Sequence, residues 1–346
     1  MLNSKVISVI LNLSVFAVVT TVLSASVDLS AKESSLEVTG FADFYHLFEG
    51  NHNSSNFGQI EFDFEMGLQK SVSAAAAIVF DPDDGLFKSG AFEIDFCLIG
   101  EEDSSFYQKE GIGAMGFVLG QFDVPFGIDY LVYPSIDRWM VTRPIVVGEI
   151  HDCWNDYGLK VYLETEFVNG MLYTTNCQKF AYEDTALVVA VGDTISYCMQ
   201  SKRSIGGRIG ITPYEMIEIG GSFAGFLNAA NETAMTVFGV DLQFNYKGLR
   251  IKGEYISKEN CVELEQCRFT QDGYYIQGLY DFGKVFAFGR YGLYSSGEDN
   301  ADDLKRVCLG GGCKIVECCR ACLEYQTWLD NHEASDALYL QTVIGF

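Results

Sequence analysis

Apolar and polar residues alternate with a period of two in many segments of this sequence, and this pattern constrains the fold more than any other feature. It is clearest in residues 59–69 (QIEFDFEMGLQ), 92–98 (FEIDFCL), 236–246 (TVFGVDLQFNY) and 249–255 (LRIKGEY). Alternation of this kind predicts β-strands with one apolar and one polar face. The chain is therefore expected to be all-β. A soluble sandwich shows the same alternation, so the pattern alone does not choose between a sandwich and a barrel.

The links between the predicted strands alternate between long and short. Long links are expected near residues 48–56, 81–88, 123–155, 175–202, 226–232, 258–271, 296–304 and 328–335. Short links are expected near Lys70-Ser71, Glu164-Thr165, Thr212-Pro213, Lys247-Gly248, Gly283-Lys284 and Val316. The link near 99–111 is longer than this pattern requires. Short turns at one end and long loops at the other, over an even number of strands, are typical of a transmembrane antiparallel β-barrel. We expect about sixteen strands, a number that leaves an aqueous channel.

The N-terminus is typical of a secretory signal peptide. Lys5 is followed by an apolar run from Val6 to Leu23, and Ser24-Ala25-Ser26 supplies small residues for cleavage. A transmembrane anchor is the alternative, but no basic stop follows the run. We therefore predict a signal peptide at 1–26 and a barrel at 27–346. After residue 26 no segment is long enough for a membrane helix, so an integral membrane protein would have to be a barrel.

The net charge of −24 over 346 residues argues against nucleic-acid binding and against a polybasic surface for membranes. The 35 glycines and the 14% aromatic content are what many closely spaced strands with glycine turns require. Aromatic residues near predicted strand ends fit the girdles of a membrane barrel; these are Tyr45, Phe57, Tyr246, Tyr274, Phe282, Tyr294 and Tyr325.

The last segment alternates through Leu338, Leu340, Thr342, Ile344 and Phe346. It resembles the C-terminal strand of outer-membrane β-barrel proteins. The resemblance implies that Phe346 is part of the signal read by the barrel-assembly machinery.

The long link at 123–155 contains Pro125, Pro134 and Pro144 together with Trp139 and Trp154. A loop of this length in a compact fold is expected to be functional. GQFDVPFG before it and WNDYGLKVYL after it are similar to the strand–loop–strand region of the phosphate-selective O/P-like porins. The mature chain as a whole looks like a bacterial outer-membrane porin with sixteen strands. The resemblance implies that this third long loop folds inward and narrows the channel. The lysine-rich ladder of the phosphate-selective porins is not evident in this sequence, so the resemblance does not imply phosphate selectivity for this chain.

Charged residues in the loop and on the predicted inner wall are the candidate pore-lining residues. In the loop they are Asp129, Asp137, Arg138, Arg143, Glu149 and Asp152. On the wall they are Lys160, Arg208, Arg250, Lys252, Arg290, Arg306 and Arg320. Loop acids facing a basic wall would create a transverse field at the constriction. The alternative is that these charges only line a wet interior.

The eleven cysteines form no zinc-binding pattern. An exported protein can form disulfides, and the candidate bridges are Cys308–Cys322 across a hairpin and Cys177–Cys198 and Cys261–Cys267 in loops. Unpaired small side chains are the alternative. Because eleven is odd, at least one thiol is unpaired or bonded to another molecule.

No catalytic motif is recognisable among the four histidines and the glycine-containing segments. His151 lies beside Asp152 and Cys153 in the loop, which suggests a Cys–His pair, but adjacent residues on an extended chain point apart, so the pairing is poor. We therefore expect no enzyme activity, no cofactor and no metal site.

The sequence favours passive diffusion of small hydrophilic solutes or ions through an outer-membrane porin, which in porins of this size is often a homotrimer. One alternative is an outer-membrane barrel with a non-channel role, such as a surface adhesin or a membrane enzyme. The other is a secreted soluble β-protein. Outward-facing Phe62, Phe64, Phe238, Phe244 and Phe346 make this last alternative costly, because a band of them would be a large exposed apolar surface.

Overall fold

The computed structural model describes residues 36–50, 52–69, 71–81, 85–100, 112–177, 189–191, 194–196, 202–228, 231, 233–261, 268–297, 302–329 and 335–346. The predicted signal peptide at 1–26 lies outside these residues, as does one partner in each of the predicted pairs Cys177–Cys198 and Cys261–Cys267. No helix within the described residues is both long and apolar enough to cross a membrane.

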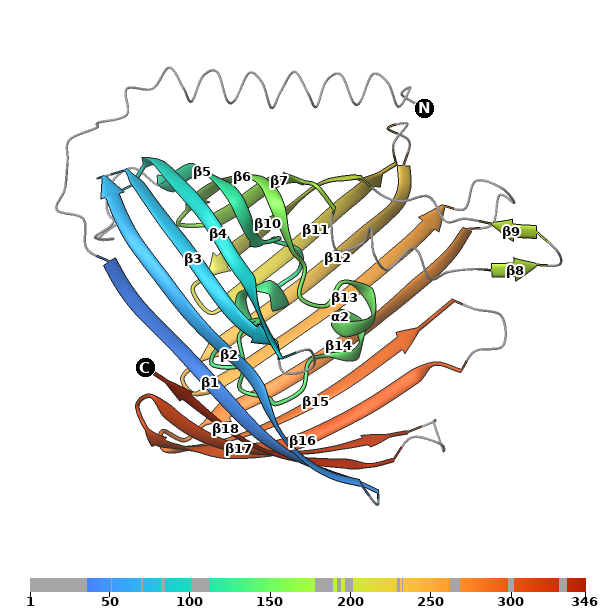
Figure 1. Cartoon of the computed structure of the whole chain (residues 1–346). Helices are drawn as coiled ribbons and strands as arrows, with labels where there is room; N and C mark the ends of the chain where they lie inside the picture. Colours follow the sequence, from blue (N-terminus) through green and yellow to red (C-terminus); the bar gives the residue numbers. More distant parts are fainter. Residues whose placement is uncertain are drawn as a thin grey trace.

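Sixteen antiparallel strands of the described chain close into one barrel (Figure 1). They are β1 (Leu36–Glu49), β2 (His52–Gln69), β3 (Val72–Asp81), β4 (Leu86–Ile99), β5 (Ile112–Asp123), β6 (Asn155–Thr165), β7 (Val168–Thr175), β10 (Arg203–Tyr214), β11 (Ile217–Leu227), β12 (Thr233–Tyr246), β13 (Leu249–Cys261), β14 (Arg268–Asp281), β15 (Val285–Ser295), β16 (Leu304–Val316), β17 (Cys319–Trp328) and β18 (Ala337–Gly345). Two short strands, β8 (Val189–Val191) and β9 (Thr194–Ser196), form a separate hairpin. The predicted fold class and strand number are confirmed.

The first and last strands close the barrel. β1 pairs with β18 from Phe41 opposite Gly345 to Glu49 opposite Ala337. Beyond the end of β18, Phe346 exchanges two backbone hydrogen bonds with Gly40, at 3.0 and 2.9 Å. The Phe346 ring lies 5.7 Å from that of Phe62 on the outer face. Pairing of the two ends removes the free edges that an open sheet would expose.

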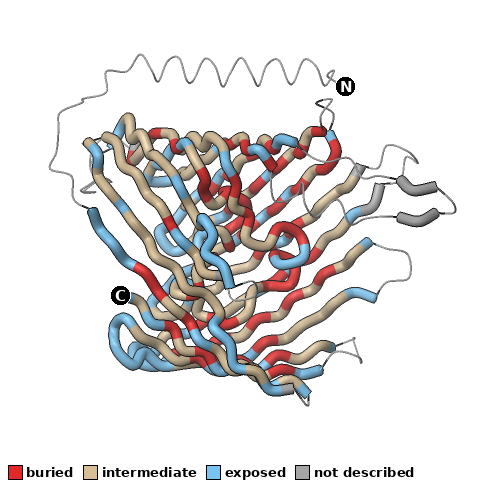
Figure 2. Tube along the Cα trace, viewed as in Figure 1, coloured by how far each residue is buried: buried red, intermediate tan, exposed pale blue. Residues whose placement is uncertain are grey.

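The two faces of the strands differ as the alternation predicts. On β12, Phe238 faces outward and is 49% exposed, whereas Asp241 faces inward and is buried. Figure 2 shows buried segments along the strands and in the loop inside them. An apolar exterior around a polar interior is the arrangement of a membrane barrel.

Five of the seven predicted girdle aromatics lie exposed on the barrel. They are Phe57, Tyr246, Tyr274, Phe282 and Tyr325. The prediction is wrong for Tyr45 and Tyr294. Tyr45 lines an internal cavity, and Tyr294 is buried in the apolar cluster inside the barrel.

Several predicted links differ from the structure in position or length. Only residues 50 and 51 connect β1 to β2, with Gly50 at φ +54°, because both strands extend further than the sequence suggested. The tight turn after β6 lies at 166–167, two residues later than Glu164-Thr165. Pro213 lies inside β10 at a register irregularity, where a proline is tolerated in a strand, and the turn follows at 215–216.

The long link between β5 and β6 folds into the barrel, as predicted for 123–155 (Figure 1). It contains the 3₁₀ helix η2 (Asp129–Val132) and the helix α2 (Ile145–Ile150), which contacts β13, β14 and β15. Its two ends meet where the Val124 N–H donates to the Trp154 carbonyl at 2.8 Å. We refer to residues 124–154 as the inward loop.

The predicted Cys308–Cys322 bridge is wrong. Only Glu317 and Cys318 connect β16 to β17, so Cys308 lies opposite Gln326 rather than opposite Cys322. Both thiols are buried and free.

Candidate functional site

Apolar packing seats one side of the inward loop against the barrel wall. Phe126, Val146, Val147 and Trp154 are buried in one cluster with wall residues that include Phe226. The Trp154 ring stacks on Phe226 at a centroid distance of 5.2 Å. Burying these large side chains stabilises the contact between loop and wall, at about 25 cal/mol per Å² of apolar surface removed from water.

The loop turns into the lumen at Gly127, which has φ +66°. Its N–H donates to Ser222 Oγ at 2.9 Å, and a Cβ there would lie 1.7 Å from Glu254 Oε1. Two residues later, buried Asp129 accepts a hydrogen bond from Lys252 Nζ at 2.9 Å. Burial acts to raise the pKa of the Asp129 carboxyl, but Lys252, Arg138 and Arg143 together hold it below its ordinary value.

Glu324 on β17 and Arg290 on β15 hold the middle of the loop. Fully buried Glu324 accepts hydrogen bonds from the N–H groups of Val141 (2.7 Å) and Thr142 (3.3 Å) and from the Thr142 hydroxyl. Arg290 donates to the Thr142 carbonyl at 2.8 Å and to its hydroxyl at 2.7 Å. A charged pair that also binds backbone groups is a strong anchor inside a protein.

Two further wall arginines bind loop carbonyls. Arg320 donates to the carbonyls of Ile136 (2.7 Å), Ser135 and Arg138, and Arg306 donates to the carbonyl of Arg143. These contacts satisfy backbone acceptors of an irregular segment that has no sheet to pair with. Arg290, Arg306 and Arg320 therefore hold the loop against the wall.

The other predicted wall cations have varied surroundings. Arg208 is buried in a cluster with Asp241 and Glu218, both at 2.8 Å. Lys160 lies over the Phe122 ring at 4.9 Å, and Arg250 lies over the Trp139 ring at 5.2 Å.

The predicted loop charges are not equally exposed. Asp137 and Glu149 are exposed and Asp129 is buried. Asp152 forms an ion pair with Arg143 at 2.5 Å. Burial acts to lower the pKa of Arg143, but Cys153, Asp152 and Asp129 together raise it above its ordinary value. Burial and the adjacent Arg143 guanidinium lower the pKa of Arg138 to about 10, so the group is still positive at neutral pH.

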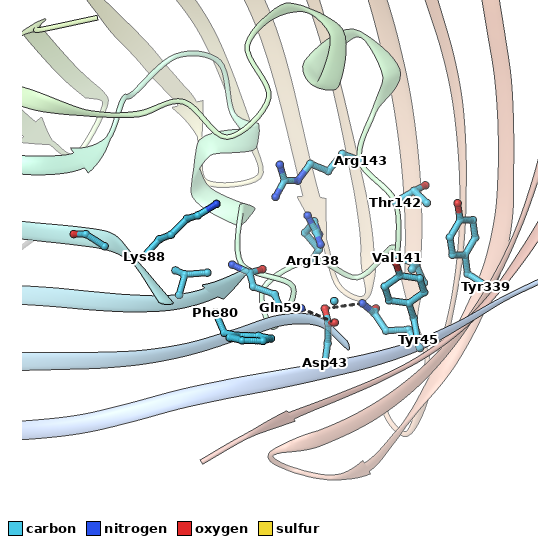
Figure 3. A pocket seen from close by; sticks show the side chains of 14 residues that line it. Asp43, Tyr45, Gln59, Phe80, Lys88, Arg138, Val141, Thr142, Arg143 and Tyr339 are labelled. Carbon is cyan, nitrogen blue, oxygen red and sulfur yellow. Dashed lines mark hydrogen bonds between the residues drawn. The ribbon is translucent and has the colours of Figure 1, made fainter. Parts of the chain in front are cut away.

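A cavity of about 550 Å³ remains between the inward loop and the strands on its other side (Figure 3). We call it the eyelet cavity. Its loop side carries Val141, Thr142, Arg138 and Arg143, and its wall side is formed by β1–β4 and β18. The wall residues are Asp43, Tyr45, Gly58, Gln59, Val79, Phe80, Lys88, Ser89, Tyr339 and Gln341. The loop touches this wall where the Ser135 N–H donates to Gln59 Oε1 at 3.1 Å.

A second cavity of about 270 Å³ lies between the loop and β12–β15. We call it the wall recess. Its charged lining residues are Arg138, Arg250, Lys252, Arg290, Asp129 and Asp137.

A third cavity, of about 320 Å³, is lined by Glu37, Glu65, Glu93 and Asp95 on β1, β2 and β4, and its described lining residues include no lysine or arginine. The predicted pairing of loop acids with a basic wall is present at the wall recess, where Asp129 of the loop binds Lys252 of β13. The eyelet cavity differs, because there the loop presents Arg138 and Arg143, and further acidic residues lie on the wall of β1, β2 and β4. The sequence could not show this, because it does not indicate which wall the loop rests on.

Sequence reasoning missed Asp43, Gln59, Thr142, Lys88 and Glu324 as residues of this site. The alternation does place Glu324 on the inner face of β17, which could have flagged it. Its contact with the loop joins residues 182 and 183 positions apart, so no local pattern predicts it.

His151 is buried in the loop and packs edge-on against Phe126 at 5.3 Å. Its Nδ1 lies 3.0 Å from the Asp152 carbonyl oxygen. Within the described part of the chain, no group of three or more His, Cys, Asp or Glu side chains is placed to hold a metal ion.

A closed sixteen-strand antiparallel barrel with an apolar exterior, tight turns at one end and a loop folded into its lumen is the architecture of bacterial outer-membrane porins. The chain is therefore a porin-like barrel of the outer-membrane type.

Solved structures support this class. The trimer form of OmpT, an outer membrane protein of Vibrio cholerae, superimposes with a TM-score of 0.63 at 13% identity, over 91% of this chain and 100% of that one. An anion-selective porin from Comamonas acidovorans has a TM-score of 0.63 at 12% identity, with 91% and 100% covered. OmpF of Salmonella typhi in complex with daunomycin has a TM-score of 0.60 at 10% identity, with 90% and 97% covered. At these identities the similarity establishes the fold alone. No protein-family model matches the sequence, and no curated protein is similar to it in sequence.

Proposed function

We propose that this barrel lies in the bacterial outer membrane and allows small hydrophilic solutes or ions to diffuse through it. The observation that carries the proposal is the eyelet cavity of about 550 Å³, which the inward loop leaves open beside β1–β4. A loop anchored by buried charges on one wall and leaving space at the other is suited to sieving. Passage then needs no cofactor and no covalent chemistry.

Selection would occur at the eyelet cavity, where low-dielectric walls strengthen each charge. Arg138 and Arg143 on the loop and Asp43, Gln59 and Lys88 on the wall are the polar groups that a solute would meet there. Of the pore-lining residues predicted from the sequence, Arg138 and Arg143 would contact the solute at the eyelet cavity. Arg290, Arg306 and Arg320 act by positioning the loop.

Liposome swelling tests the proposal. Liposomes containing the refolded protein, without its signal peptide, are placed in isotonic solutions of neutral sugars of increasing size. We expect swelling with a monosaccharide and progressively slower swelling with larger sugars. Liposomes without protein, or with heat-denatured protein, are the controls. No swelling by a correctly folded barrel would favour a non-channel role, such as an adhesin or a membrane enzyme.

We also propose that the barrel forms a homotrimer, since one structure with the same fold is described as a trimer. Light scattering on the detergent-solubilised protein, corrected for bound detergent, would give the number of chains directly.

A further inference from the structure

Arg138 lies at the boundary between the two cavities beside the inward loop. Arg138 and Thr142 line both the eyelet cavity and the wall recess. The eyelet cavity includes Phe80 and Lys88, on either side of the link from β3 to β4 at the long-loop end of the barrel. The wall recess includes Asn245 and Arg250, on either side of the tight turn at 247–248. The two cavities therefore border different parts of the barrel wall and meet at Arg138 and Thr142.

Both cavities have an excess of positive groups. The eyelet cavity contains Arg138, Arg143 and Lys88 against one carboxylate, Asp43. That carboxylate already accepts hydrogen bonds from the Gln59 N–H at 2.9 Å and from Gln341 Nε2 at 3.0 Å.

The wall recess contains four cations and two carboxylates. The Asp129 carboxylate is bound to Lys252. Arg250 stacks on the Trp139 ring, and among the described residues it forms no ion pair. A negative group that enters the recess therefore meets cations whose charge is only partly balanced.

The guanidinium of Arg138 is one of the cations that no carboxylate of the described residues contacts directly. It forms no ion pair with a described residue, and its Nε is buried without a hydrogen-bond partner among them. Its neighbour Arg143 carries the same charge and, unlike Arg138, is paired with Asp152. A guanidinium in this position gains from an anion that shares its buried surroundings.

We propose that solutes carrying a carboxylate or phosphate group pass through the eyelet cavity and the wall recess in turn, and that Arg138 binds the oxyanion in both. The inference rests on the proposed diffusion function and adds the class of solute. A planar guanidinium presents paired N–H groups that match two oxygens of an oxyanion. A single group shared by both cavities lets the solute move between them without losing its main contact.

The first test is the reversal potential of single channels in a potassium chloride gradient. We expect chloride to carry most of the current of the unaltered protein. Arg138→Gln should lower the chloride-to-potassium permeability ratio about fivefold, as expected for losing about 1 kcal/mol of attraction across a wet passage. Arg203→Gln removes the same charge from an exposed position at the start of β10, outside both cavities, and should leave the ratio unchanged.

The second test measures binding by adding sodium acetate or inorganic phosphate to channels conducting chloride. We expect a saturating fall in chloride conductance with at least one of the two probes, and the more effective probe identifies the group as carboxylate or phosphate. Arg138→Gln should weaken this block at least as strongly as it weakens selectivity. Arg138→Lys keeps the charge without the paired donors, so it should retain chloride selectivity and lose most of the block. It also serves as the second variant if Arg138→Gln folds poorly.

The outcomes separate this inference from the diffusion function. Folded protein without conductance would refute the diffusion function. Open channels that favour potassium, or a block that Arg138→Gln does not change, would overturn the oxyanion site and leave diffusion intact.

Discussion

Glu324 is a buried anchor of the inward loop. Its carboxylate is fully buried and accepts hydrogen bonds from two loop N–H groups and one loop hydroxyl. Arg290 lies 3.9 Å from it and binds the same threonine. Removing one member of a buried charged network is costly, because the other member is left without its partner.

We therefore expect Glu324→Gln to loosen the loop. The amide keeps one acceptor oxygen but loses the charge, and the cost should be about 1.5–3 kcal/mol, the usual value of a charge-assisted hydrogen bond. The thermal midpoint at which the folded barrel unfolds should fall, and single-channel current should become noisier. Glu166→Gln, in the exposed turn after β6, is the matched control and should change neither. Unchanged stability and unchanged current noise would show that Glu324 does not anchor the loop.

The buried thiols provide a check on the register of β16 and β17. We expect Cys308 and Cys322 to react with a maleimide only after the barrel unfolds, and exposed Cys318 to react in the folded protein. Mass spectrometry after alkylation under non-reducing conditions gives the result for each residue. A cross-linked peptide joining Cys308 to Cys322 would mean that the register is different.

At the scale of elements, the loop enters the lumen because Gly127 adopts a left-handed conformation directly beside Glu254. Both the positive φ and the close approach favour glycine at this position. In α2, Gly148 is the opposite case, because a Cβ there would meet nothing within 4 Å.

Gly127→Ala should therefore push the loop away from β13 and destabilise the barrel, by about 1–3 kcal/mol from backbone strain alone. Gly148→Ala makes the same chemical change where it fits, and it should stabilise α2 by about 0.5–1 kcal/mol. The two thermal midpoints, measured in the same detergent, should move in opposite directions. Equal midpoints for the two variants would contradict the described path of the loop.

Most elements could be predicted from the sequence because the signal for a strand is local. A period of two identifies the two faces of a strand, and glycine-containing turns separate one strand from the next. The predicted positions of turns were wrong in places, because the sequence pattern does not locate a turn to within two residues. Pro213 suggested a turn but lies at an irregularity in β10, and a turn of two residues after β16 moved Cys308 away from Cys322.

The site was less predictable because it depends on contacts between distant parts of the chain. The length and composition of 123–155 indicated a loop in the lumen. The loop rests on the wall that carries Arg290, Arg320 and Glu324. These residues bind the loop but lie more than 140 positions further along the chain. For this reason, the sequence could not show that loop acids meet the basic wall at Asp129 and Lys252, while the loop presents Arg138 and Arg143 to the eyelet cavity.

At the scale of the whole molecule, the barrel depends on β18 reaching back to β1. Phe346 contributes two backbone hydrogen bonds to Gly40 and a ring contact to Phe62 at this seam. The resemblance of the last strand to those of other outer-membrane barrels suggests a second role for Phe346 in assembly.

Phe346→Ala removes the ring and keeps the backbone bonds. The lost aromatic contact is worth about 0.5–1.5 kcal/mol, so refolding in detergent should still succeed with a small loss of stability. Insertion into the outer membrane of cells should fall more steeply, if the ring is also read during assembly. Phe238→Ala removes another exposed ring, away from the seam, and serves as the control. Equal cellular insertion for both variants would argue against an assembly role. The heat-modifiable band on a gel reports folded protein in each case.

Single-channel recording in a planar bilayer tests the central claim, that the barrel is an open diffusion pore, most directly. The refolded protein without its signal peptide should produce discrete current steps that increase linearly with voltage. Protein unfolded by heat should produce none. Repeated absence of steps from a barrel that is folded and inserted would contradict the claim and show that the cavities beside the loop do not join into a passage.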